Sequence, residues 1–68
     1  MIDTDKLRGV FVERGVKQYE VAKMLGMSPK TFYLRMKKGI FGSDEIERMI
    51  EAYDIKNPME IFLMESNL

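Results

Sequence analysis

The chain has 68 residues without a cysteine or a histidine, and its 11 basic residues balance its 11 acidic ones. One small domain, residues 1–68, accounts for this length. The absent residue types exclude a disulfide framework, a zinc knuckle and catalysis by a thiol or an imidazole. The hydrophobic fraction of 46% excludes a disordered chain.

Neither a membrane span nor a secretion signal is predicted. No apolar run approaches the roughly 18 residues that a span needs, and acids follow Met1 where a signal peptide carries basic residues. The sequence also offers no general base, nucleophile or metal cluster. We therefore expect a cytoplasmic protein that is not an enzyme and that uses no cofactor, metal or small-molecule substrate.

The first two predicted helices are bounded by capping residues and glycines. Asp3 or Thr4 is expected to cap a first helix that Gly15 ends, and a second helix runs over 17–25 before Gly26. Apolar residues recur in both segments at the spacing of one helical face. These positions are Leu7, Val10, Phe11, Val21, Ala22 and Leu25.

The third and fourth predicted helices follow the same rules. The third begins at Ser28-Pro29, because serine is a good N-cap and proline is favoured at the first helical position. It continues to Lys38 and ends at Gly39. Ser43 is expected to cap a fourth helix. The apolar face of that helix consists of Ile46, Met49, Ile50 and Tyr53.

A C-terminal helix is predicted over about 57–65. By periodicity alone, the apolar run 61–64 fits a helix or a strand. The start at Asn57-Pro58, with Glu60 at the spacing of a capping box, favours the helix.

A helix-turn-helix is predicted over about 17–38. Two short helices that cross steeply need a small residue at the crossing, which Ala22 supplies, and a turn residue that tolerates positive φ, which Gly26 supplies. Apolar anchors are available on both helices, among them Leu25 and Phe32. The predicted fold class is all-α, a compact bundle of about five short helices.

The chain resembles the lambda-repressor-like, Cro-type helix-turn-helix family, especially its small phage Cro and repressor proteins. The resemblance extends over roughly residues 5–64 and rests on Gln18, Ala22, Leu25-Gly26-Met27-Ser28, Thr31-Phe32 and Glu60-Ile61-Phe62. It implies a transcriptional regulator in a bacterial or phage-infected cell that binds double-stranded operator DNA, an inverted repeat, as a homodimer. The sequence departs from the family at Arg35, where an apolar residue is common.

Charge is distributed unevenly along the chain. Residues 28–42 hold four cations and no acid, whereas residues 43–68 hold seven acids and two cations. On a helical wheel of about 100° per residue, Phe32 and Met36 define the inner side of the third helix. The outer side and its flanks supply the predicted contacts to DNA bases: Lys30, Leu34, Tyr33 and Lys37.

Contacts to the DNA backbone are predicted around this helix. The resemblance places Gln18 at a phosphate, and the start of the fourth helix is a further anion site. The predicted backbone contacts are Gln18, Ser28, Thr31, Arg35, Lys38 and Ser43. Two alternatives remain for these residues. The lysines would then form an ordinary solvated face, and Tyr33 would pack against the second helix. The whole chain could also be a protein-interaction module, such as an antitoxin, adaptor or anti-repressor.

The apolar C-terminal segment is the predicted dimer contact. Its residues are apolar nearly all round the helix, more than a small monomer buries on one side. The residues expected at the partner are Met59, Leu63 and Met64. In the alternative interpretation the segment closes the core, with Ile61 and Phe62 inside.

Overall fold

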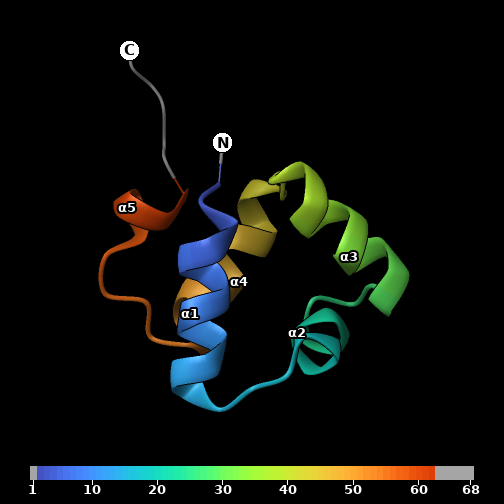
Figure 1. Ribbon diagram of the computed structural model, residues 1–68, viewed down its shortest axis with the longest axis horizontal. Coiled ribbons are helices and arrows are strands. Elements are labelled where there is room, and N and C mark those ends of the chain that lie inside the picture. Colours follow the sequence, from blue (N-terminus) through green and yellow to red (C-terminus); the bar gives the residue numbers. More distant parts are fainter. Residues whose placement is uncertain (1, 63–68) are drawn as a thin grey trace.

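The computed structural model describes residues 2–62, and this part of the chain consists of helices and connecting loops without a strand (Figure 1). The helices are α1 (Thr4–Arg14), α2 (Gln18–Met24), α3 (Pro29–Lys38), α4 (Ser43–Ala52) and α5 (Pro58–Phe62). The predicted all-α fold is confirmed. No helix among these residues is long and apolar enough to cross a membrane.

The helix boundaries follow the predicted capping residues closely. Asp3 caps α1 and accepts a hydrogen bond from the backbone N–H of Lys6 at 3.1 Å. Ser28 caps α3 in the same way and accepts from Thr31. Both helices end at a glycine with φ of 70°, as the sequence predicts.

The N-cap of α4 is one residue earlier than predicted. Gly42 is the cap, and Ser43 is the first helical residue. The backbone N–H of Gly42 donates to the carboxylate of Glu45 at 2.8 Å, so the helix start is satisfied without the serine hydroxyl. The prediction that Ser43 caps this helix is therefore wrong.

Phe11 of α1 lies at the centre of the core. Its ring is 6.3 Å from that of Phe32 in α3 and 5.8 Å from that of Tyr53, directly after α4. Burial raises the pKa of the Tyr53 hydroxyl, and the nearby carboxylate of Glu20 raises it further. The side chains that surround this centre are Ile2, Leu7, Val21, Ala22, Leu25, Met36, Phe41, Met49, Ile55, Ile61 and Phe62.

The predicted helix-turn-helix is formed by α2 and α3. Gly26 has φ of 75°, and Met27 donates its N–H to the carbonyl of Ala22 at 3.0 Å across the turn. Val21 and Ala22 are fully buried where α2 packs on the rest of the core. The small residue and the positive-φ residue therefore have the roles that the sequence predicts.

α5 closes the bundle on the side of α1 away from α3 (Figure 1). Ile61 and Phe62 are buried, and the carbonyl of Ile61 accepts from the N–H of Asp3 at 2.7 Å. The helical interpretation is confirmed as far as Phe62, and the core-closing alternative is correct for these two residues. The predicted extension over 63–65 lies outside the described residues.

Candidate nucleic-acid interface

α3 has one face in the core and one face in solvent. Phe32 and Met36 are buried at 2% and 3% exposure and fix the helix against α1 and α2. They are one helical turn apart, as the sequence predicts. Because this packing fixes the rotation of α3 about its own axis, it also determines which of its residues face solvent.

All four predicted base-contacting residues lie on the exposed side of α3. Tyr33 is 59% exposed and Leu34 is 44% exposed, although both are large and partly apolar. Lys30 and Lys37 are exposed as well. Tyr33 is therefore not buried against α2.

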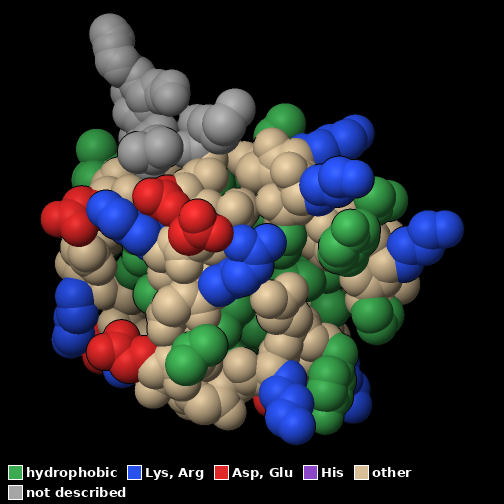
Figure 2. All heavy atoms as spheres, in the orientation of Figure 1, with side chains coloured by type: hydrophobic (Ala, Val, Ile, Leu, Met, Phe, Trp, Pro, Cys, Tyr) green, Lys and Arg blue, Asp and Glu red, His purple; other side chains and the backbone are tan. Residues whose placement is uncertain are grey.

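The charge on this side is positive. α3 carries no acid, and Arg35, Lys37 and Lys38 occupy its last turn. Figure 2 shows basic side chains spread over the α3 side of the molecule with apolar ones between them, whereas the acidic side chains of this view gather on the other side. Such a mixture of cations and exposed apolar groups suits the phosphates and base edges of a DNA groove.

Arg35 differs from the other cations of α3 because it has an internal partner. Its guanidinium donates to the carboxylate of Glu45, which is only 18% exposed in its side chain and also accepts from Gly42. The pair joins the last turn of α3 to the first turn of α4. Arg35 is half-buried in consequence, and it lies on the flank of the predicted interface.

The remaining predicted backbone contacts border the outer face of α3. Gln18 and Ser43 are the exposed first residues of α2 and α4. Ser28 and Thr31 are exposed at the start of α3, where the two hydroxyls are 3.0 Å apart in a hydrogen bond. Lys38 is exposed at the end of the helix.

Two exposed apolar side chains near α3 are absent from the contacts predicted from the sequence. Tyr19 in α2 is 60% exposed, directly after Gln18, and Ile40 is exposed just beyond α3. Tyr19 points away from the apolar face of α2, which a helical wheel of that segment also indicates. Ile40 has no comparable signal, because it lies between two helices.

The predicted dimer residues are only partly described. Met59 in α5 is 64% exposed, so its side chain lies outside the core. Leu63 and Met64 lie outside the described residues. Within residues 2–62, no group of acidic side chains has the arrangement of a metal site.

Residues 13–39 match the family described as "Bacterial regulatory protein, Fis family", a helix-turn-helix family. The matched segment contains α2, the turn at Gly26 and α3. No curated protein and no solved structure matches the chain. The match supports a DNA-binding regulator of the helix-turn-helix type, and it does not extend to the Cro-type family in particular.

Proposed function

We propose that this chain is a sequence-specific transcriptional regulator of the phage or prophage Cro-like repressor type, which inserts α3 into the major groove of its operator. The observation that carries the proposal is the outer face of α3. It is free of acids, it holds exposed lysines beside Tyr33 and Leu34, and buried Phe32 and Met36 fix it in place.

The base-reading residues are those nearest the exposed start and middle of α3. An N-terminal lysine such as Lys30 can donate to guanine O6 or N7, and Leu34 can pack on a thymine methyl group. Tyr33 and Lys37 extend the same face on its flank. In this arrangement the exposure of Leu34 is explained by the DNA that would cover it.

The backbone contacts frame this face and set the depth of the helix in the groove. Lys38 and Arg35 would bind phosphates from the last turn of α3, while Gln18 and Ser43 would do so from the starts of α2 and α4. Ser28 and Thr31 add hydroxyls at the start of α3. These groups supply affinity that depends on salt and not on sequence.

Two copies of the chain are proposed to bind one inverted repeat in the cytoplasm of a bacterial cell. One recognition helix touches few base pairs, and a two-fold dimer places two such helices about 34 Å apart, one turn of DNA. Met59 is the described residue of the proposed contact, and Leu63 and Met64 belong to the same sequence run.

Selection of bound duplexes from a random pool tests the proposal. The expected result is one enriched inverted repeat for the wild type and none for the double variant Lys30→Ala/Lys37→Ala. The matched control, Arg8→Ala/Lys56→Ala, removes the same charge from exposed positions outside α3 and should select the wild-type repeat. An unenriched pool, with stoichiometric capture of a protein partner instead, would favour the protein-interaction module.

A further inference from the structure

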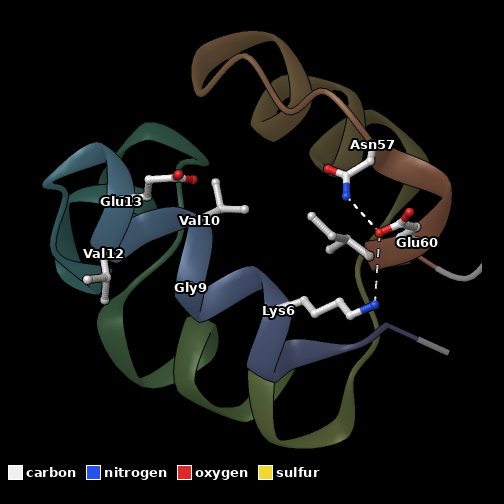
Figure 3. A pocket seen from close by; sticks show the side chains of 8 residues that line it. Lys6, Gly9, Val10, Val12, Glu13, Asn57 and Glu60 are labelled. Atoms are coloured by element: carbon white, nitrogen blue, oxygen red, sulfur yellow. Dashed lines mark hydrogen bonds and ion pairs between the residues drawn. The ribbon is translucent and has the colours of Figure 1, made fainter.

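A groove of about 570 Å³ lies between α1 and α5, outside the proposed DNA interface (Figure 3). The α1 wall carries Lys6, Gly9, Val10 and Glu13, and the α5 wall carries Glu60 and Ile61. Val10 points into the groove, and Lys6 reaches across it toward Glu60 (Figure 3). The groove is open along its length and mostly apolar at its base.

The surroundings of Gly9 within one copy give no reason for a glycine at this position. It lies in the middle of α1, where glycine costs about 1 kcal/mol relative to alanine. A Cβ built on Gly9 would meet no described atom within 4 Å, so the fold of one copy does not require a glycine there. A missing side chain on an exposed helical face allows another backbone to approach closely.

The charges on this face of α1 are complementary to those on the same face of a second, antiparallel copy. Lys6 and Glu13 are two helical turns apart on the same side of α1, with Gly9 and Val10 between them. A second α1 in antiparallel orientation, related by a two-fold axis between Gly9 and Val10, would place each Lys6 opposite the partner copy's glutamate at position 13. The same operation places Gly9 opposite Val10, so a side chain meets a gap.

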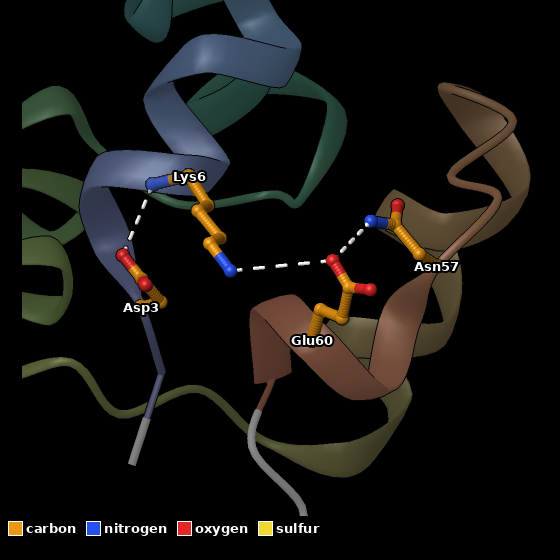
Figure 4. A network of polar contacts seen from close by, with 4 residues as sticks. All are labelled: Asp3, Lys6, Asn57 and Glu60. Atoms are coloured by element: carbon orange, nitrogen blue, oxygen red, sulfur yellow. Dashed lines mark hydrogen bonds and ion pairs between the residues drawn. The ribbon is translucent and has the colours of Figure 1, made fainter.

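Within one copy, the neighbouring polar side chains leave the charges of Lys6 and Glu13 exposed. Lys6 Nζ is 4.0 Å from Glu60, whose carboxylate is held at 2.8 Å by the side-chain amide of Asn57 (Figure 4). Both members of the Lys6–Glu60 pair are more than half exposed. Glu13 makes no ion pair with another described residue.

We propose that the groove between α1 and α5 binds a second copy of this chain, with the two α1 helices antiparallel and Lys6 paired with Glu13 of the other copy. The inference deepens the proposed function, because it gives the two-copy regulator a specific contact that extends beyond the C-terminal segment. Each interface of this kind is isologous, so both charge pairs form or neither does.

Sedimentation of the full chain without DNA tests the proposal through charge reversal. The wild type should show reversible self-association at tens of micromolar. Glu13→Lys places two lysines opposite each other twice per dimer and should raise the dissociation constant about tenfold. Because Lys6→Glu would place a carboxylate beside Glu60 of the same copy, the charge swap is made in a Glu60→Gln background. In that background Lys6→Glu/Glu13→Lys restores opposite charges across the two-fold axis and should associate more tightly than Glu13→Lys.

Gly9→Gln provides a second test in which folding and association respond in opposite directions. Glutamine is a better helix former than glycine and has open space at this position, so the midpoint of thermal unfolding at low concentration should rise. The same side chain blocks the close approach of the second helix, so the dimer should be lost.

Three results would overturn the inference. They are a wild type that stays monomeric, an association constant that Glu13→Lys leaves unchanged, and a charge-swapped double variant that associates no better than Glu13→Lys. None of them decides whether α3 reads DNA bases, which the selection experiment measures separately. Conversely, a self-associating chain that selects no DNA would leave this contact standing and reject the proposed function.

Discussion

Arg35 and Glu45 form an ion pair that connects the last turn of α3 to the first turn of α4. Glu45 also caps α4 by accepting a hydrogen bond from the N–H of Gly42. One half-buried carboxylate therefore holds the end of α3 and the start of α4 together. The pair therefore contributes to the direction in which α3 presents its outer face.

We expect a double-mutant cycle with Arg35→Gln and Glu45→Gln to give a coupling free energy of about 1 kcal/mol in chemical denaturation. Glutamine at position 45 keeps an oxygen for the N–H of Gly42, so the cycle isolates the ion pair. The Arg8–Asp5 pair is the control, because its acid is almost fully exposed. Its coupling should lie below about 0.5 kcal/mol, and equal couplings for the two pairs would contradict the account.

Lys30 and Lys38 should have different effects on DNA recognition. Lys30→Ala is expected to cost about 1–3 kcal/mol of discrimination at one base pair, because a base contact is lost. Lys38→Ala should weaken every sequence alike and reduce the slope of log affinity against log salt by about 1. Titrations against single-base variants of the selected site at several salt concentrations separate the two effects. Identical profiles for the two variants would reject the assignment.

Gly26 should contribute to the stability of the fold and make no direct contribution to DNA binding. Gly26→Val is expected to lower the free energy of unfolding by roughly 1–3 kcal/mol, because φ of 75° is strained for a β-branched residue. A clash at the Cβ plays no part, since no described atom lies within 4 Å of a Cβ at this position. Gly26→Asn should cost less, because asparagine tolerates the left-handed region. Denaturation midpoints measure both, and equal losses would rule out backbone strain as the cause.

The helix boundaries could be predicted from the sequence because local rules determine them. Asp3, Ser28 and the glycines after α1 and α3 act within one turn of their own position. The start of α4 was misplaced by one residue, since serine and glycine are both good caps and the side chain of Glu45 decides between them.

Contacts between distant segments could not be predicted in the same way. Arg14 donates to the carbonyls of Tyr53 and Asp54 at 2.7 and 3.1 Å, across about 40 positions of the chain. Its place in the helical stripe of α1 gives no indication of that partner. For the candidate site, periodicity identified the outer face of α3, whereas the pairing of Arg35 with Glu45 depends on how α3 and α4 pack.

Stability should fall at alkaline pH in part through Tyr53. Its pKa is raised above the ordinary value of 10.0 in the folded chain, mainly by burial and further by Glu20. The folded state thus favours the neutral phenol, and the stabilisation is present below pH 10 and lost as the pH rises through the folded pKa. Tyr53→Phe should show a shallower decline in unfolding free energy above that pH. Tyr33→Phe, at an exposed position, is the control and should follow the wild type.

The ratio of affinities for the selected site and for a scrambled duplex of equal length and composition, measured at one fixed salt concentration, tests sequence-specific reading by α3 most directly. The account predicts a ratio of about 1,000 or more for the wild type. For Lys30→Ala/Lys37→Ala it predicts a ratio close to one with residual, salt-sensitive binding to both duplexes. A wild-type ratio near one, or a high ratio that survives the double substitution, would contradict the claim that this face reads the operator.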